Sequence, residues 1–529
     1  MIIRAFSAFV AFAMPVTPLA AQPETPARGA PPRVIAVDYT REAGPVNRMF
    51  QQCVGAGRAA EGLRADWQRQ LAVVRRQCGF TYIRMHGLLT DDMGVYREDN
   101  KGRPVYNWQY VDMLYDYLLS IGMKPFVELS FMPNDLASGS QTCFWWRGNV
   151  TPPKDWRKWE DFIRAAAAHW QQRYGDEEVK TWFFEVWNEP NLNYFFSGTQ
   201  ADYFKLYQAT CRAIKAVNAS YRVGGPATAG CAWVPEFIAF CADNRVPVDF
   251  ISTHAYAVDE GYVDESGAKG TVLSPNPQSI SGDVKRVRRQ IDQSPLPKLP
   301  LHMTEWSASY TPFDPIHDSY HSAAFIVDRV RQTAAAADSL SYWVFTDIFE
   351  EAGPRMTPFH GGFGLVNYQG IDKAAFYAFQ YLNRLGTTEL RSDDPSSWVT
   401  KDGRGGVEAL VWDYAYTHPG KSVNNQEFYT RDLPPARSMP VTIKMNRLRP
   451  GRYGLSVYRV GYRANDAYAT YRDLGAPAQL TPDQVAYIKS ANSGAPFAQS
   501  LATVGGDGTF SLDEVVREND VLLFELKPL

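Results

Sequence analysis

Two short hydrophobic segments of this 529-residue chain each end in a glutamate close to a tryptophan. The segment 183–190 reads Phe-Phe-Glu-Val-Trp-Asn-Glu-Pro, so Glu189 directly precedes a proline. Because proline cannot donate a hydrogen bond to a sheet, a strand must stop here, and Glu189 lies at its rim. The segment 301–306 reads Leu-His-Met-Thr-Glu-Trp and carries Glu305 near its end. Two carboxyl groups on one rim suit glycoside cleavage, in which one protonates the leaving oxygen and the other faces the anomeric carbon.

The order Asn188-Glu189 sets a condition on the backbone at this rim. In a regular strand, successive side chains point to opposite faces of the sheet. Both residues can therefore enter one site only if the strand end bulges or stops pairing, which is common next to active sites. We expect an irregular strand end at this point.

Eight β-rich runs alternate with amphipathic helical segments before residue 348. The expected strands are residues 48–54, 81–86, 124–131, 180–187, 221–225, 249–256, 301–306 and 341–347. The expected helices include residues 65–78, 108–121, 156–174, 201–217, 283–291 and 320–337. Strands separated by helical crossovers pair in parallel. Eight such units over roughly 340 residues favour a closed (β/α)8 TIM barrel over an open doubly wound sheet.

The pattern changes after residue 387. Alternating strand candidates at residues 407–416, 441–445, 454–463 and 521–526 are separated by turn formers, and residues 481–489 are the main helical exception. We expect an α/β protein with a catalytic barrel at residues 48–387 and an appended C-terminal β-sandwich at residues 388–529. Residues 33–47 begin with a strand-like segment that could join the sandwich.

Charge and composition exclude several classes of partner. With 54 Lys and Arg against 57 Asp and Glu, the formal net charge is −3, so the positive field that attracts nucleic acid or anionic lipid is missing. No stretch after the N-terminus approaches the ~20 apolar residues that a membrane helix needs. Aromatic residues make up 14% of the chain. Most must fill the core, but sugars stack on aromatic rings, so this content also suits a carbohydrate-handling protein.

The N-terminus and the cysteines bear on location. Residues 1–21 contain Arg4, an apolar run and a final pair of alanines, which is typical of a cleaved signal peptide and predicts export to the periplasm or the medium. The six cysteines show no spacing typical of a zinc site, and they leave open either buried free thiols or one or two disulfides. A monomer is compatible with the sequence, which sets no oligomeric state.

A glycine-rich segment, residues 55–60, loosely fits the GxGxxA form of a dinucleotide loop. The hydrophobic strand before it and the acidic residue ~20 positions after it are both missing, which argues against such a cofactor.

Here the residues resemble a known family. The Asn-Glu-Pro of the fourth run and the Thr-Glu-Trp of the seventh look like the retaining barrel hydrolases of glycoside hydrolase clan A. Three segments narrow this resemblance: Tyr-Ile-Arg-Met-His-Gly-Leu-Leu at 82–89 with two aspartates at 91–92, Trp-Asn-Glu-Pro-Asn-Leu at 187–192, and Phe-Thr-Asp-Ile-Phe-Glu-Glu at 345–351. Together they resemble family 39, which includes β-xylosidases and α-L-iduronidases. The resemblance spans about residues 48–385 and implies a glycosidase that needs no metal or organic cofactor.

The resemblance also implies roles for individual residues. Glu189 would be the general acid/base, Glu305 the nucleophile, and Asn188 the partner of the sugar 2-hydroxyl. Further residues at strand ends would line the sugar pocket: His86, Asp92, Phe131, His254, Trp343, Glu350 and Glu351. Structural readings compete with these roles, because His254 could be a hydrogen-bonded core histidine and Phe131 and Trp343 could fill the barrel.

The expected activity is that of an exo-acting xylan 1,4-β-xylosidase, which releases terminal β-D-xylose from xylobiose and xylooligosaccharides by double displacement. An α-L-iduronidase, another clan A glycosidase, an endo-acting hydrolase and a non-catalytic carbohydrate-binding barrel are the alternatives. A uronate in a desolvated pocket must meet a cation, yet Asp347, Glu350 and Glu351 make the rim acidic. Arg355, or Arg84 if it faces inward, could supply the cation that a uronate needs and so reverse this argument against a uronate substrate.

Overall fold

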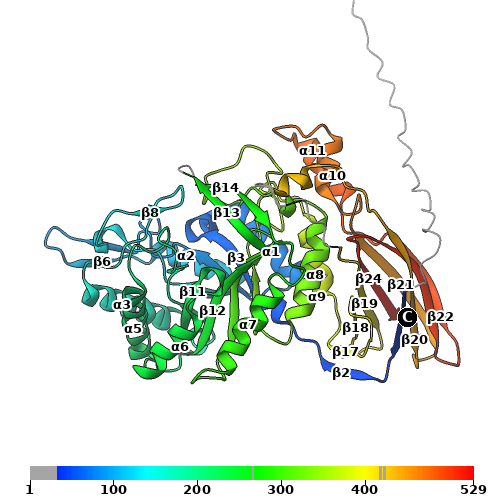
Figure 1. The fold of residues 1–529 in the computed structure, drawn as a ribbon, viewed down its shortest axis with the longest axis horizontal. Coiled ribbons are helices and arrows are strands. Elements are labelled where there is room, and N and C mark those ends of the chain that lie inside the picture. The colour runs from blue at the N-terminus through cyan, green and yellow to red at the C-terminus, as the bar shows by residue number, and fades with distance from the viewer. Residues whose placement is uncertain (1–32, 265–266, 416–419, 421–424) are drawn as a thin grey trace, which may run out of the picture.

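The structure of the protein, a computed structural model, describes residues 33–264, 267–415, 420 and 425–529. The expected signal peptide at residues 1–21 lies outside these ranges. Figure 1 shows a barrel surrounded by helices, next to a mostly β-stranded domain. Within the described ranges, no helix combines the length and the apolar character needed to cross a membrane.

Eight parallel strands close into a barrel, which confirms the predicted TIM-barrel fold. In chain order they are β3 (Cys53–Arg58), β4 (Tyr82–His86), β7 (Lys124–Glu128), β10 (Phe183–Glu185), β11 (Arg222–Thr228), β12 (Phe250–Tyr256), β15 (Leu301–Ser307) and β16 (Ser339–Tyr342). The crossover helices are α1 (Ala65–Cys78), α2 (Gln109–Ser120), α3 (Trp156–Tyr174), α4 (Asp176–Val179), α5 (Gln200–Val217), α6 (Val234–Asp243), α7 (Ser281–Asp292), α8 (His321–Thr333) and α9 (Ala374–Asn383). Parallel pairing places the carboxyl ends of all eight strands at one rim.

The helices form where capping and apolar spacing agree. The Asp155 side chain accepts from the first backbone N–H groups of α3, and Thr199 and Asp202 form a capping box at the start of α5. The buried residues of α3 recur at helical spacing and face the sheet: Trp159, Phe162, Ile163, Ala166, Ala167 and Trp170. These features explain why the sequence pattern predicts both helices to within a residue or two.

The first barrel strand differs from its expected bounds. The sequence pattern predicts a strand at residues 48–54, but Met49–Gln51 form a 3-10 turn and β3 starts at Cys53. The glycine-rich segment is therefore the strand itself and not a loop. A Cβ atom on Gly55 would lie 2.3 Å from Cε3 of Trp343, so glycine leaves the space that the Trp343 ring occupies. Glycine weakens the strand pattern, which is why the sequence misplaces this element.

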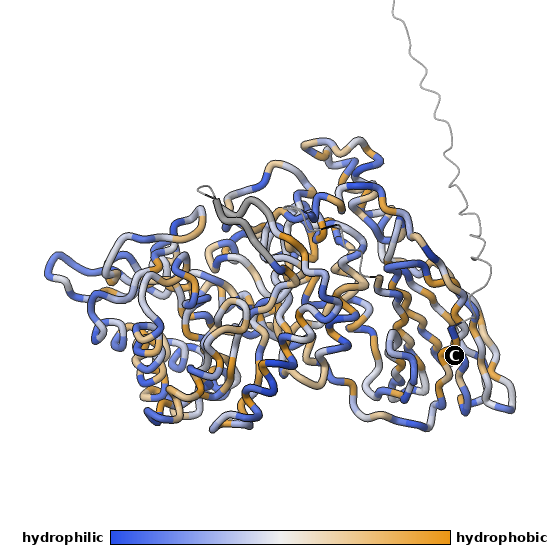
Figure 2. Tube along the Cα trace, in the orientation of Figure 1, coloured by the Kyte–Doolittle hydropathy of each residue, from blue (hydrophilic) through white to orange (hydrophobic). Residues whose placement is uncertain are grey.

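The C-terminal domain is a sandwich of two sheets. The larger sheet has the order β2-β17-β18-β19-β24-β21-β22, and the smaller one the order β1-β20-β23. Their strands are β1 (Arg33–Asp38), β2 (Glu42–Pro45), β17 (Thr388–Leu390), β18 (Ser397–Lys401), β19 (Val407–Trp412), β20 (Ser438–Asn446), β21 (Gly451–Val460), β22 (Ala498–Val504), β23 (Phe510–Arg517) and β24 (Val521–Pro528). Figure 2 shows hydrophobic and hydrophilic residues alternating along these strands, as expected when one face is buried.

Two short helices of this domain reach toward the barrel. They are α10 (Ala467–Asp473), which the sequence pattern misses, and α11 (Pro482–Ala491). A small apolar cluster joins them to the loop after β16, through Phe359, Ile371, Ala467, Tyr471, Leu480 and Ile488. The domain thus contacts a loop that leaves the rim of the barrel.

Three hairpins lie in the loops of the barrel: β5–β6 (Tyr96–Glu98 and Pro104–Tyr106), β8–β9 (Thr142–Cys143 and Gly148–Asn149) and β13–β14 (Val258–Asp264 and Gly267–Leu273). All six cysteines are buried free thiols. Of the two arrangements that the sequence leaves open for them, the structure has the free thiols.

Candidate active site

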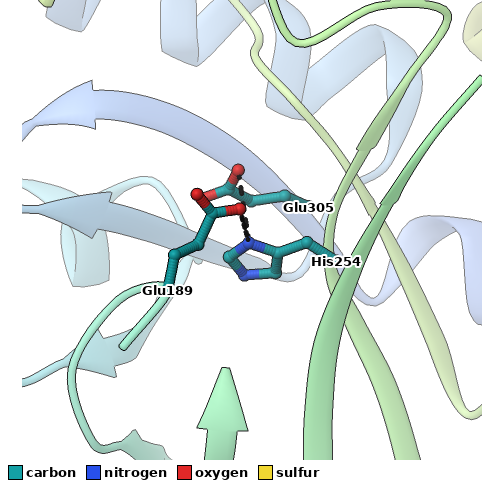
Figure 3. A group of neighbouring side chains, drawn as sticks. All are labelled: Glu189, His254 and Glu305. Carbon is teal, nitrogen blue, oxygen red and sulfur yellow. Dashed lines mark hydrogen bonds and ion pairs between the residues drawn. The ribbon is translucent and has the colours of Figure 1, made fainter. Parts of the chain in front are cut away.

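Glu189, His254 and Glu305 come together at the carboxyl ends of β10, β12 and β15 (Figure 3). Each offers a nitrogen or oxygen atom within 4.8 Å of those of the other two, and all three residues are buried. His254 Nδ1 lies 2.8 Å from Glu189 Oε1 and 3.5 Å from Glu305 Oε2. Glu189, on a segment that leaves β10, therefore reaches the group from the side opposite to the strands of Glu305 and His254.

The backbone after β10 explains how neighbouring residues enter one site. The strand ends at Glu185, and Trp187 and Glu189 adopt φ angles of 73° and 44°. Such left-handed conformations are uncommon for residues with side chains, and they turn the chain out of its alternation. The Glu189 backbone N–H donates to the Ala227 carbonyl at 2.8 Å, which holds the turn. This is the irregular strand end that the sequence requires.

Arg84 on β4 is the central cation of the site and is completely buried. Its guanidinium donates to Glu185 Oε2 at 2.5 Å, to Glu305 Oε1 at 2.6 Å and to Asn188 Oδ1 at 2.9 Å, and it lies 2.8 Å from Glu128 Oε2. Because Asn188 accepts through its oxygen, its amide nitrogen is left to donate to a ligand. All five donors of a guanidinium are fixed in one plane, so Arg84 sets the positions of several acids at once.

Glu305 accepts hydrogen bonds at both of its oxygens. Arg84 donates to Oε1, and the hydroxyl of Tyr256 on β12 donates to Oε2 at 2.7 Å. The pairing of β12 with β15 shifts register between Thr253 and His254, which brings His254 opposite Glu305. Two donors, one of them charged, suit a carboxylate that stays ionised and attacks as a nucleophile.

Glu189 has the opposite environment. Burial, together with the negative charge of Glu305, holds the pKa of Glu189 well above its usual range and so favours the protonated carboxyl. Burial, with the charges of Arg84 and His86, lowers the pKa of His254 well below its usual value, so this imidazole is neutral. The protonated form is thus favoured at Glu189, whereas Glu305 accepts hydrogen bonds at both oxygens. Such different environments suit an acid and a nucleophile in one site.

Similarity to known proteins identifies the family of this chain. Residues 33–507 match the model of the family described as glycosyl hydrolases family 39. This chain belongs to glycosyl hydrolase family 39. A β-xylosidase of Geobacillus stearothermophilus is 40% identical over 486 residues, which cover 90% of this chain and 92% of that protein. A β-xylosidase of Caldicellulosiruptor saccharolyticus is 44% identical over 369 residues, which cover 69% of this chain and 75% of that protein.

A solved structure extends the similarity to the whole described fold. The crystal structure of a monomeric β-xylosidase from Caulobacter crescentus CB15 superposes with a TM-score of 0.90 at 46% sequence identity. The superposition covers 94% of this chain and 100% of that structure. The barrel and the sandwich of this chain therefore both have counterparts in that β-xylosidase.

In this family 39 chain, the aromatic candidates surround His86. The ring of Trp343 lies 4.6 Å from the His86 ring and that of Phe131 lies 6.2 Å from it, and both are buried. Phe144, which the sequence does not single out, lies in the turn of the β8–β9 hairpin. Its ring stacks on that of His86, with 5.6 Å between the ring centroids. These rings pack around His86, whose Nε2 lies 3.5 Å from Glu305 Oε1.

His86 itself carries a charge. Burial opposes this charge, but the Glu128 carboxylate, 2.7 Å from His86 Nδ1, outweighs burial and raises the pKa of His86 to about 10. His86 Nε2 then points to Glu351 Oε1 at 3.3 Å and to Glu305 Oε1 at 3.5 Å. Glu351 is buried, which raises the pKa of its carboxyl to about 7. Of the two neighbouring glutamates at 350 and 351, Glu351 is the one that faces His86.

Asp92 and Glu350 lie further out and already have partners. Arg58 pairs with Asp92 at 2.8 Å and with Glu350 at 2.6 Å, and Arg64 adds a second pair to Glu350 at 2.9 Å. The side chain of Asp92 is 34% exposed. These two predicted site residues belong to an ion-paired outer rim and do not contact the three central residues.

The sequence analysis did not identify several residues that surround the two glutamates. They are Glu128, Glu185, Tyr256, Phe144, and Arg84 in its role as a buried, ion-paired cation. A signal was present for three of them, because Arg84, Glu128 and Glu185 are charged residues inside otherwise hydrophobic strands. Charged residues are almost never fully buried unless they are paired, so three in neighbouring strands indicate a buried network. Tyr256 has no comparable signal in the sequence.

The donor types of Glu189, His254 and Glu305 would also suit a metal ion. However, the Arg84 guanidinium lies 2.6 Å from Glu305, and the protonated His86 lies 3.5 Å from the same oxygen. Two resident positive charges disfavour a third by Coulomb repulsion. The three residues fit proton transfer better than they fit metal coordination.

Proposed function

We propose that the chain is a retaining exo-β-xylosidase that releases terminal β-D-xylose from xylobiose and xylooligosaccharides. The observation that carries the proposal is the close approach of Glu189 and Glu305, within 4.8 Å, with the protonated form favoured at Glu189 and with Arg84 donating to Glu305. Retaining enzymes hold their carboxyl groups about 5–5.5 Å apart, whereas inverting enzymes leave about 6.5–9.5 Å for a water molecule. The separation supports retention.

The first step uses both glutamates. A carboxylate oxygen of Glu305 bonds to the anomeric carbon while the bond from that carbon to the leaving oxygen breaks, and Glu189 transfers its proton to the leaving oxygen. The product is a glycosyl ester on Glu305 and a free alcohol. Asn188, whose oxygen is held by Arg84, donates its amide N–H to the sugar 2-hydroxyl. At this step the hydroxyl of Tyr256 no longer faces a charged carboxylate, but it stays next to the ester on Glu305 and orients it.

The second step reverses the proton transfer. Once Glu305 is an ester it carries no charge, so the repulsion that raises the Glu189 pKa disappears and Glu189 becomes a better base. Glu189 takes a proton from water, the water oxygen bonds to the anomeric carbon, and the ester bond breaks. Xylose leaves with its original configuration, and both glutamates return to their starting protonation.

A neutral pentose is the proposed substrate, with α-L-iduronide as the runner-up. The names of the two bacterial relatives support a β-xyloside. Arg84 faces inward, but its donors are bound to Glu185, Glu305, Glu128 and Asn188 and are not free for a uronate. Arg355 lies over the ring of Phe313 at 4.8 Å, and its Nη2 is buried without a hydrogen-bond partner among the described residues, so Arg355 is the one of these two cations that a uronate would need to reach. Glu305 and Glu351 would repel a uronate.

Exposed aromatic residues next to the pocket support an oligosaccharide leaving group. Trp145 follows Phe144 in the β8–β9 turn, is 59% exposed, and donates its backbone N–H to the Glu351 carbonyl at 2.7 Å. Tyr194 is 50% exposed, and its hydroxyl accepts from the Phe144 backbone N–H at 2.8 Å. Rings held this close to the pocket and open to solvent suit stacking of a second sugar unit. The signal-like residues 1–21 support export, so the same proposal assigns the activity to the periplasm or the medium.

The proposal is tested by proton NMR of the first product formed from an aryl β-D-xyloside. The expected product is the β-anomer of xylose, and an initial α-anomer would contradict double displacement. The rates on aryl β-D-xyloside, α-L-arabinoside and α-L-iduronide then rank the substrates. Faster turnover of the iduronide would overturn the choice of xylose, and hydrolysis of none of the three would favour a non-catalytic barrel. Internal cleavage of long xylan would favour an endo-acting enzyme.

A further inference from the structure

A second cavity lies away from the pair of glutamates, between the barrel and the C-terminal domain. It has a volume of about 580 Å³ and is lined by α1, by the 366–372 segment of the loop after β16 and by α11. This volume falls in the range of about 300–1,000 Å³ that is usual for small-molecule sites. We refer to it as the α1–α11 cavity.

The two helices face this cavity with regular stripes of their surface. Asp66, Arg69, Gln70 and Val73 are spaced three or four residues apart on α1, and Pro482, Val485 and Lys489 are spaced in the same way on α11. Helices that pack directly against each other bury apolar stripes. Here Asp66, Arg69 and Gln70 of α1 and Lys489 of α11 face the space between the two helices, beside apolar residues of the same helices. The space therefore has both polar and apolar walls.

Two acceptors in the lining lack hydrogen-bond partners among the described residues. The carboxylate of Asp372 accepts no hydrogen bond there, and its side chain is partly exposed at the wall of the cavity. The side-chain oxygen of Gln369 is buried behind this wall and also has no partner there. Asp372 is therefore the acceptor that a donor entering the cavity can reach.

The remaining lining residues define the chemistry of that donor. Asp66 and Asp372 are balanced by Arg69 and Lys489, so the cavity favours neither an anion nor a cation. Gln70 is held by Thr346 at 2.5 Å and by the Tyr368 carbonyl at 3.1 Å. The Tyr368 side chain is half-buried and lines the same wall. Alternating donors and acceptors beside an aromatic ring match a neutral polyol.

We propose that the α1–α11 cavity is a second, non-catalytic binding site for a short neutral xylooligosaccharide. The class of sugar rests on the proposed function, whereas the cavity and its unpartnered acceptors do not. Sugar hydroxyls donate to Asp372, Arg69 and Lys489 donate to sugar oxygens, and one sugar face stacks on Tyr368. The site is carried by the loop after β16, whose other part holds Glu350 and Glu351 at the pocket.

The experiment counts xylotriose molecules bound per chain by calorimetry and native mass spectrometry. The full chain carries Glu305→Gln, so that bound xylotriose is not cleaved. Tyr368→Ala and Asp372→Ala are compared with Tyr487→Ala, an exposed tyrosine of α11 that does not line the cavity. Two molecules are expected to bind, and the second is expected to weaken by about tenfold or more in the two cavity variants only.

The possible outcomes test the second binding site and the proposed function separately. A single binding event that is unchanged in Tyr368→Ala and Asp372→Ala overturns the second site, and so do two events that are both unchanged. A single event that is lost in Tyr368→Ala supports the second site but counts against the proposed function, because the pocket then binds no xylotriose. With Glu305 restored, the cavity variants should hydrolyse aryl xyloside at rates within about twofold of the unmodified chain, which shows that they fold.

Discussion

At the residue scale, the site is a group of acidic side chains to which one arginine and one histidine give different electrostatic environments. Glu305 is bound by Arg84 and Tyr256, whereas Glu189 meets a neutral imidazole and the field of Glu305. Removal of Glu305 and removal of Glu189 should therefore impair different steps of the reaction. Glu305→Gly should lose about 10⁴-fold or more in kcat on every substrate, because no glycosyl ester forms.

Glu189→Ala should depend on the leaving group. An activated aryl xyloside needs no proton to leave, so glycosylation should stay fast and added azide should accelerate turnover, whereas hydrolysis of xylobiose should fall by about 10²–10⁴-fold. Steady-state and burst kinetics on both substrates measure this difference. Equal losses on both substrates would refute the acid role of Glu189.

The raised pKa of Glu189 predicts the alkaline side of the pH profile. Activity requires the protonated acid, so kcat/KM should fall as pH rises through a pKa well above the usual range of a carboxyl. Neutralising the neighbouring charge by Glu305→Gln should move the Glu189 pKa down, because that charge helps to raise it. Titration of Glu189 by carbon NMR in both chains reads the shift. An unchanged or higher value in Glu305→Gln would contradict the coupling.

At the element scale, strand β3 depends on a glycine that faces a ring. A Cβ on Gly55 would lie 2.3 Å from the ring of Trp343 and 3.1 Å from the Tyr342 carbonyl oxygen. Gly55→Ala should lower the free energy of unfolding by about 1–3 kcal/mol, through overpacking, and should reduce activity by displacing Trp343. Gly403→Ala is the matched control, because no atom lies within 4 Å of its added Cβ. Denaturant unfolding of both variants measures the effect, and equal stabilities would argue against this packing.

The β8–β9 hairpin predicts a split between substrates. Trp145 is exposed beside the pocket, so Trp145→Ala should lower kcat/KM for xylotriose by about three- to tenfold and leave an aryl β-D-xyloside within about twofold. The exposed Tyr110 on α2 supplies a control, since Tyr110→Ala removes a ring of similar exposure from a helix surface. Equal effects on both substrates would place Trp145 in structural packing instead of the leaving-group site.

At the scale of the whole molecule, the barrel and the sandwich share one hydrophobic cluster. Trp398 and Trp412 of the sandwich belong to the cluster that fills the barrel, and Trp412 Nε1 donates to Asp328 of α8 at 3.3 Å. Arg384 after α9 pairs with Glu525 of β24 at 2.6 Å. The first described strand also belongs to the sandwich, because β1 pairs with β20 and precedes the barrel in the sequence. The two domains are thus connected through both sequence and packing.

This continuity predicts one cooperative unfolding transition. Differential scanning calorimetry of the full chain should give a single peak whose calorimetric and van't Hoff enthalpies agree. Trp412→Ala should lower the transition temperature and could split the peak, because it removes about 3–5 kcal/mol of packing at the junction of the domains. Two separate peaks in the unmodified chain would show that the barrel and the sandwich unfold independently.

The sequence by itself determined the class of fold and the two glutamates. Strand and helix periodicity is local, and Pro190 excludes a strand that continues past Glu189, so the barrel and the rim position of Glu189 could be inferred from neighbouring residues. Only the tertiary structure decided the protonation of the side chains in the site. The protonation of Glu189 and of His86 depends on Glu305, Arg84 and Glu128, which come from other strands. Coulomb energies depend on distances in space, and a single sequence without its fold does not contain these distances.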